Sequence, residues 1–160
     1  MAIGVTEERT DEVRTLLAAI RGWAQGRPDV VAVGLVGSWA NGGARMDSDV
    51  DIVLLTEDRG LYLEGEAWMY EMGGVELVWT RRWGPVTERR FALPSGLEVE
   101  LGVALPSWAS TGSVDEGTHR VVNNGMSIVY DPKGVLAGLL DACGRSEATE
   151  SSGRSGVGHA

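Results

Sequence analysis

The apolar residues near the start of the chain recur every three to four positions, which predicts an amphipathic helix over residues 6–25. Thr6 can accept a hydrogen bond from the first turn of this helix, and Gly26 and Pro28 end it. The predicted apolar face consists of Val13, Leu16, Leu17, Ile20 and Ala24.

An almost continuous apolar run over residues 30–36 predicts a strand that is buried on both faces. Residues 49–55 alternate instead, so one side of this second predicted strand is apolar and the other carries two carboxylates. Residues 57–68 are interpreted as either a loop or a weak helix. Further strands are predicted over residues 75–81, 87–93, 97–105 and 126–130, with turns at 94–96 and 123–125.

Asp131 and Pro132 match a helix cap followed by proline at the first helical position, which predicts a last helix to about residue 142. From Gly144 onward Ser, Gly, Glu and Arg dominate, a composition typical of disorder. We therefore expect one α/β domain over residues 1–143 and a disordered tail over residues 144–160. The domain should hold a twisted, mixed sheet of about five strands with helices packed on one face.

The composition excludes several classes of protein. Because Cys143 is the single cysteine and there are two histidines, neither an internal disulfide nor a zinc cluster is expected, and a cytoplasmic setting is the simplest interpretation. No apolar run reaches the roughly 20 residues of a membrane helix, and the first residues lack the pattern of a signal peptide. The net charge of −9 disfavours binding to long nucleic acid, although a nucleotide could still bind through a metal ion.

The most informative residues are Asp49 and Asp51, which project from the same side of a predicted strand. Two like charges on one strand face repel each other, and a divalent cation is the usual compensation. Gly37 and Ser38 form a small-residue turn upstream, between a strand and a short helix, where a phosphate could bind. Asp47 is interpreted as a loop residue, because no apolar alternation surrounds it.

A site that holds two metal ions typically needs a third carboxylate from a neighbouring strand. Glu98 and Glu100 are the candidates, since they share one face of a later predicted strand. Glu100 is preferred because it lies deeper in the apolar run, where an unpaired charge would be costly. Glu98 could instead be the ligand or support it, and either glutamate could simply lie on the solvated face of an antiparallel strand.

Gly37-Ser38, the run from Ser48 to Asp51 and a later strand-borne acid together resemble the nucleotidyltransferase superfamily that includes DNA polymerase beta, and within it the minimal, single-domain members. The resemblance implies that Gly37 and Ser38 contact a triphosphate. It also implies that Asp49 and Asp51 bind magnesium, and that Glu100 completes the metal site and can help to deprotonate an acceptor hydroxyl. The third carboxylate of that family is usually aspartate, whereas both candidates here are glutamates.

Arginines near the predicted site could hold the triphosphate or pair with neighbouring carboxylates. Arg45 precedes Asp49 in the turn, and the others lie on two predicted adjacent strands: Arg81, Arg82, Arg89 and Arg90. For each of these the pairing with a carboxylate is the simpler interpretation.

The resemblance implies a magnesium-dependent nucleotidyltransferase with two Mg²⁺ ions, which moves a nucleoside monophosphate, AMP from ATP in the simplest case, onto a hydroxyl acceptor. The acceptor could belong to a small molecule or to a partner protein, because minimal members are often antitoxins that pair with a small helical protein. A homodimer could also share the site, and no membrane partner is expected. The alternative is a non-catalytic nucleotide-binding or antitoxin-like interaction module with the same fold.

Overall fold

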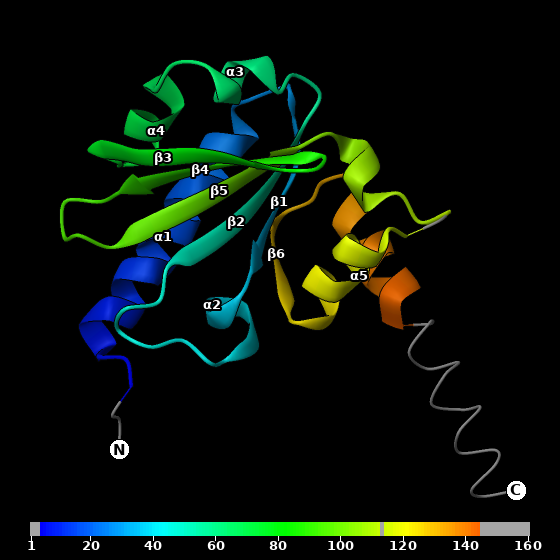
Figure 1. Cartoon of the computed structure of the whole chain (residues 1–160). Coiled ribbons are helices and arrows are strands. Elements are labelled where there is room, and N and C mark those ends of the chain that lie inside the picture. The colour runs from blue at the N-terminus through cyan, green and yellow to red at the C-terminus, as the bar shows by residue number, and fades with distance from the viewer. Residues whose placement is uncertain (1–3, 113, 145–160) are drawn as a thin grey trace, which may run out of the picture.

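A six-stranded mixed sheet forms the centre of the structure, a computed structural model that describes residues 4–112 and 114–144 (Figure 1). The strand order is β3-β4-β5-β2-β1-β6. β2 and β5 run parallel, whereas every other neighbouring pair is antiparallel. The strands are β1 Val30–Val36, β2 Val50–Thr56, β3 Glu76–Trp83, β4 Val86–Ala92, β5 Glu98–Ala104 and β6 Met126–Tyr130.

One face of the sheet is covered by α1 (Glu7–Gln25), α3 (Gly60–Leu63) and α4 (Ala67–Glu71). Ile20 of α1 and Trp68 of α4 are buried there with the inward residues of the strands, because burial of an apolar helix face drives this packing. Thr6 caps α1 as predicted, since its side chain accepts a hydrogen bond from the backbone N–H of Arg9.

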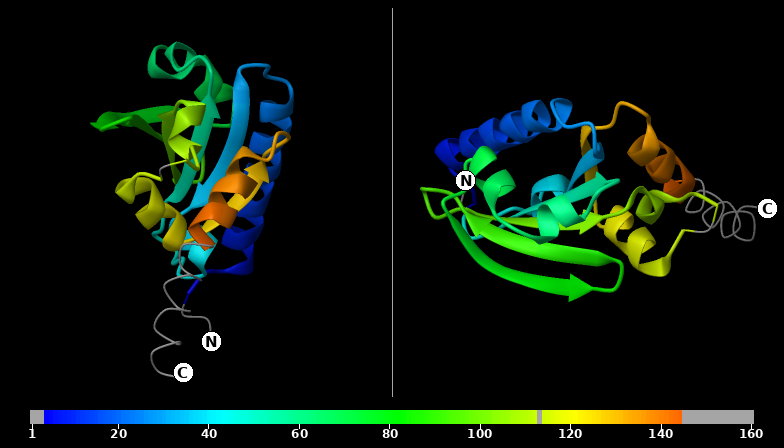
Figure 2. Two further views of the ribbon diagram at one scale, coloured as in Figure 1. Left: turned by 90° about the vertical axis from the view of Figure 1, so that its right-hand side faces the viewer. Right: turned by 90° about the horizontal axis from the view of Figure 1, so that it is seen from above.

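The opposite face carries the 3₁₀ turn η1 (Pro106–Ala109), α5 (Glu116–Asn123) and a helix over residues 135–144. Leu136 and Leu139 of that last helix are fully buried against this face. Figure 2 shows the strands running between α1, in blue, and α5, in yellow. The α/β class and the mixed sheet are therefore confirmed, but the sheet has six strands rather than about five, and helices pack on both faces rather than on one.

The last helix begins at residue 135 rather than at Pro132. Gly134 has φ +70, so the chain first turns through a left-handed conformation that a helix cannot contain. Asp131 still stabilises the start of the helix, because its Oδ2 accepts a hydrogen bond of 2.9 Å from the backbone N–H of Ala137. The tail predicted over residues 144–160 lies, apart from Gly144, outside the described residues.

Among the residues that the structure describes, no helix combines the length and the apolar character that crossing a bilayer requires.

Candidate functional site

A glycine with a left-handed backbone begins the site, where β1 ends and α2 (Ser38–Asn41) starts. Gly37 has φ +75, and a Cβ atom at this position would lie 2.3 Å from Oδ2 of Asp51. Only glycine can therefore provide both this turn and the close approach of the carboxylate. Ser38, the next residue, is half-buried.

Three carboxylates meet on the face of the sheet that also carries α5. Asp51 lies directly opposite Glu100 in the parallel register of β2 and β5, and Asp49 immediately precedes β2. One oxygen from each of the three side chains lies within 4.8 Å of the others. Among the described residues, these three form the one group of His, Cys, Asp and Glu side chains with the spacing of a metal site.

A guanidinium lies among these carboxylates. Nη2 of Arg90, from β4, is 2.7 Å from Oδ2 of Asp49 and 2.9 Å from Oε2 of Glu100. Its Nη1 is 3.0 Å from Oε1 of Glu98. Burial lowers the pKa of Arg90, but the hydrogen bonds and charges of these carboxylates outweigh burial and raise the pKa above its ordinary value. Arg90 therefore remains charged.

The charge of Asp51 is only partly compensated. Burial above all, and then the charges of Glu100 and Asp49 and a hydrogen bond with Glu100, together raise the pKa of Asp51 to about 7. The charge of Arg90 opposes these effects without cancelling them. A further cation at Asp51 would relieve this repulsion, so the chemistry of the site fits a divalent metal ion.

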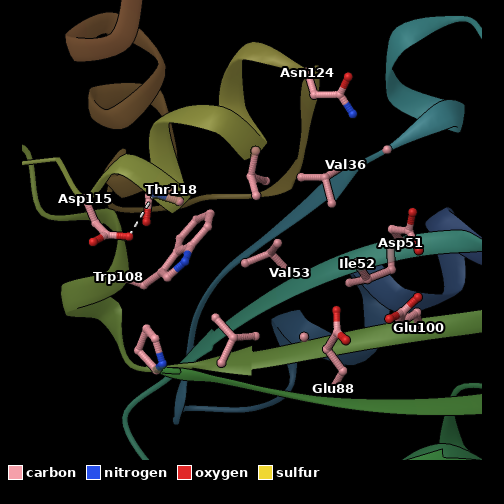
Figure 3. A pocket seen from close by; sticks show the side chains of 16 residues that line it. Val36, Asp51, Ile52, Val53, Glu88, Glu100, Trp108, Asp115, Thr118 and Asn124 are labelled. Carbon is pink, nitrogen blue, oxygen red and sulfur yellow. Dashed lines mark hydrogen bonds between the residues drawn. The ribbon is translucent and has the colours of Figure 1, made fainter. Parts of the chain in front are cut away.

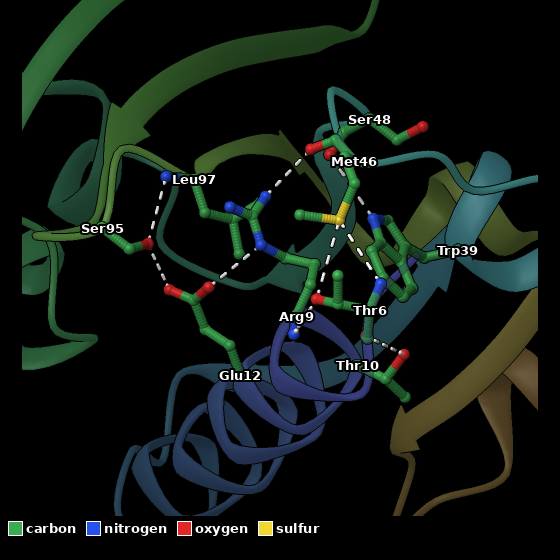
Figure 4. Close-up of polar contacts among 9 residues, drawn as sticks. All are labelled: Thr6, Arg9, Thr10, Glu12, Trp39, Met46, Ser48, Ser95 and Leu97. Atoms are coloured by element: carbon green, nitrogen blue, oxygen red, sulfur yellow. Dashed lines mark hydrogen bonds and ion pairs between the residues drawn. The ribbon is translucent and has the colours of Figure 1, made fainter. Parts of the chain in front are cut away.

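The loop that delivers Asp49 is attached to the start of α1 (Figure 4). Nη1 of Arg9 donates a hydrogen bond of 3.0 Å to the carbonyl oxygen of Met46, and the backbone N–H of Thr6 lies 3.5 Å from the Met46 sulfur. Nε of Arg9 is also 3.1 Å from Glu12, which accepts a hydrogen bond from Ser95 in the β4–β5 turn. These contacts connect the loop to the start of α1 and, through Arg9 and Glu12, to the turn between β4 and β5.

Replacing Arg9 with methionine should loosen this loop, because the carbonyl of Met46 loses a charged donor. We expect a cost of about 1–2 kcal/mol in the free energy of unfolding. Amide hydrogen exchange over residues 43–48 should also become faster. The matched control is Arg14→Met on the same helix, whose exposed side chain pairs with the exposed Asp11 in an i, i+3 contact. Equal exchange rates in the two variants would contradict the role given to Arg9.

A cavity of about 400 Å³ extends from the carboxylates along β2 and β5 (Figure 3). Val53 and Gly102 line its floor, and Val121 of α5 and the ring of Trp108 line the other side. Asp51 and Glu100 lie at one end (Figure 3). Within the part of the chain that the structure describes, no lysine or arginine lines the cavity. The cavity is large enough for a nucleoside or a small-molecule acceptor, and its walls suit an uncharged or cationic ligand.

The structure brings some of the predicted site residues together and separates others. Glu100, rather than Glu98, lies with the two aspartates, and Glu98 pairs with Arg90. Gly37 touches Asp51 as described above, whereas the side chain of Arg45 extends into solvent and pairs with Asp47 at 3.5 Å.

Among the strand arginines, only Arg90 reaches the carboxylates of the site in the described structure. Arg89 points to the other face of the sheet, where its Nη1 donates to the carbonyl oxygens of Tyr62 and Gly65 at 2.9 and 2.8 Å. The role of Trp108 and α5 in the cavity was not predicted, because residues 106–122 contain no regular apolar spacing.

Residues 17–81 match the model of a family described as nucleotidyltransferase domain. No curated protein matches the chain. The family match and the fold confirm the resemblance that Gly37-Ser38 and the paired aspartates carry.

The structure of a cytoplasmic RNA terminal U-transferase is similar to the chain, with 19% sequence identity and a TM-score of 0.50 over 63% of this chain and 31% of that one. A Cid1 poly(U) polymerase structure gives 19% identity, a TM-score of 0.47, and 62% and 32% coverage. An aminoglycoside 6-adenyltransferase from Bacillus subtilis gives 13% identity, a TM-score of 0.44, and 59% and 35% coverage. The chain thus spans about a third of the length of these proteins, and the first likeness establishes the shared fold.

Proposed function

We propose that this chain, which carries a nucleotidyltransferase domain over residues 17–81, transfers a nucleoside monophosphate from a triphosphate to a hydroxyl acceptor. The observation that supports the proposal best is the meeting of Asp49, Asp51 and Glu100 at the turn formed by Gly37. ATP is the proposed donor, and AMP is the group that it would transfer. A small molecule or a partner protein is the proposed acceptor.

Mg²⁺ is the proposed cofactor, since an all-carboxylate donor set suits a hard cation that prefers oxygen. Asp49, Asp51 and Glu100 would hold it. When bound, it would stabilise the negative charge that develops on the attacking and leaving oxygens. The raised pKa of Asp51 supports this assignment, because the carboxylates are arranged so closely that they disfavour their own ionised form.

The protein's own residues would position the reactants. The turn at Gly37 and Ser38 would contact the triphosphate, while Glu100 would accept the proton of the acceptor hydroxyl. A bond forms between the acceptor oxygen and the α-phosphorus, the bond from that phosphorus to the bridging oxygen breaks, and pyrophosphate leaves. Catalysis would thus consist mainly of positioning and electrostatic stabilisation.

The cavity beside Asp51 and Glu100 would hold the nucleoside or the acceptor rather than the triphosphate. The described residues of its lining include no cation to pair with phosphates, whereas the indole of Trp108 and several valines suit an aromatic or apolar surface. Because one end of the cavity reaches Asp51 and Glu100, a ligand within it could present a reacting group directly to the carboxylates.

A second candidate is a nucleotide-binding or interaction module that transfers nothing. The observation that favours it is the pairing of Arg90 with Asp49 and Glu100, which satisfies two of the three carboxylates without any metal. Such a protein would bind a partner or a nucleotide through the same fold.

Calorimetry and mass spectrometry on the full chain would separate these functions. We expect a non-hydrolysable ATP analogue to bind only with Mg²⁺ present. We also expect ATP labelled in its α-phosphate to transfer that label to an acceptor in a panel of hydroxyl compounds and candidate partner proteins, with release of pyrophosphate. Binding without any transfer or pyrophosphate release would favour the nucleotide-binding module. No Mg²⁺-dependent binding would contradict the transferase and favour a module that binds a partner alone.

A further inference from the structure

The Arg90 guanidinium occupies a position between Asp49 and Glu100 that a metal ion could otherwise take. Its Nη2 alone lies within 2.9 Å of an oxygen from each of these residues, so one nitrogen bridges two members of the carboxylate group. This pattern is that of a bridging cation, because the same two carboxylates share one positive group.

Contacts with Trp79 and Glu98, together with the strand register, hold Arg90 in this position. Its side chain is only 16% exposed, and its guanidinium carbon lies 4.9 Å from the centre of the Trp79 ring. Glu98 holds the other nitrogen, Nη1, at 3.0 Å. Register also contributes, because Arg90 on β4 lies directly opposite Glu100 on β5. Moving the guanidinium away would leave its buried charge without these partners, which is costly.

The pairing leaves room for one divalent ion, not two. Asp49 and Glu100 each give one oxygen to Arg90, while Asp51 lies outside these ion pairs. The carboxylate oxygens that Arg90 does not contact suffice for one cation next to Asp51. A second ion about 3.5–4 Å further on would have to displace the guanidinium or lie against its positive charge.

We infer that Arg90 takes the place of the second metal ion, so that the nucleotide complex holds one divalent ion and one guanidinium. This inference rests on the proposed function. Arg90 is then a positioning residue: it fixes Asp49 and Glu100 and neutralises part of their charge. Glu100 remains a carboxylate that can accept the acceptor's proton.

The inference predicts the number of ions in the complex of the full chain with Mn²⁺ and a non-hydrolysable ATP analogue. Mn²⁺ serves as the probe because electron paramagnetic resonance distinguishes an isolated ion from a spin-coupled pair. Wild-type protein should bind one isolated ion per chain. Arg90→Met, which removes the charge and keeps an apolar stem against Trp79, should bind two ions with the signal of a coupled pair.

Two further variants serve as controls. Arg90→Lys should retain one ion, because an ammonium restores the positive charge at the same place. Arg82→Met should also retain one ion, since Arg82 is an exposed residue of β3 whose strand position faces away from the carboxylates. Circular dichroism and melting curves would verify that each variant folds.

A coupled pair in the wild-type complex would overturn the inference, and so would a single ion in both the wild type and a folded Arg90→Met. The wild-type measurement decides by itself if Arg90→Met does not fold: one isolated ion supports the inference and a coupled pair refutes it. No protein-bound Mn²⁺ in any of the proteins would instead overturn the proposed function, and the inference with it.

Discussion

Replacing Asp51 with asparagine should lower the rate of nucleotidyl transfer by roughly a thousandfold. Asparagine keeps the shape of the side chain but removes the charge that a divalent ion needs, and the loss of several kcal/mol of charge stabilisation corresponds to about that factor. Mg²⁺-dependent binding of a non-hydrolysable ATP analogue, measured by calorimetry, should be lost together with the transfer.

The same substitution should raise the melting temperature of the metal-free protein above neutral pH. The pKa of Asp51 is raised to about 7 by burial and by its neighbours, so ionised Asp51 opposes folding there, whereas asparagine does not. This combination of a more stable and an inactive protein is typical of a residue retained for function.

Asp47→Asn provides the matched control for Asp51→Asn. Asp47 lies in the loop before β2, is exposed and, within the described structure, pairs with the exposed Arg45 alone, so its loss should change neither transfer nor melting temperature appreciably. Full activity in Asp51→Asn, or equal losses in the two variants, would remove Asp51 from the proposed metal site.

Replacing Gly37 with alanine should weaken Mg²⁺-dependent binding of the ATP analogue by about a hundredfold, which corresponds to about 2.8 kcal/mol, because it displaces a carboxylate of the proposed metal site. The new Cβ atom would lie 2.3 Å from Oδ2 of Asp51, so the carboxylate must move. The backbone at φ +75 adds strain of its own. Calorimetry with Mg²⁺ and the analogue would measure the effect.

Gly42→Ala is the control that introduces backbone strain without a collision between the new Cβ atom and a neighbouring side chain. Gly42 also has a left-handed backbone, with φ +83, but a Cβ atom there meets nothing within 4 Å. We therefore expect it to lower stability by about 1 kcal/mol while binding stays close to that of the wild type. Similar binding losses in both variants would show that backbone strain, and not the contact with Asp51, explains the effect of Gly37→Ala.

The sequence predicted the part of the site that depends on local alternation. Asp49 and Asp51 share a face because a strand has a period of two, and the apolar residues between and after them identify the strand. The structure places Glu100, the preferred third ligand, beside Asp51, because the parallel register of β2 and β5 pairs the two residues, and its role as a ligand stays a prediction.

Features that depend on contacts between distant segments could not be predicted. No local pattern distinguishes Arg90 from Arg89, although one lies among the carboxylates and the other is buried on the opposite face. The 3₁₀ turn η1 and α5 were not predicted for a related reason, whereas the last helix of the chain was predicted. Only Thr118 and Val122 of α5 are buried, too few for a helical apolar stripe, so helices were expected on one face of the sheet alone.

The pairing of β2 with β5 also makes the positions of the site carboxylates depend on the packing of the protein interior. Val99 and Leu101 are fully buried, and Glu100 lies between them on the other face. A slip of one residue would turn Glu100 into the apolar interior and expose both neighbours, so it is strongly disfavoured. The buried residues of β5 therefore fix the relative positions of the carboxylates. A substitution at Val99 or Leu101 would change the geometry of the site, although both side chains lie on the opposite face of the strand.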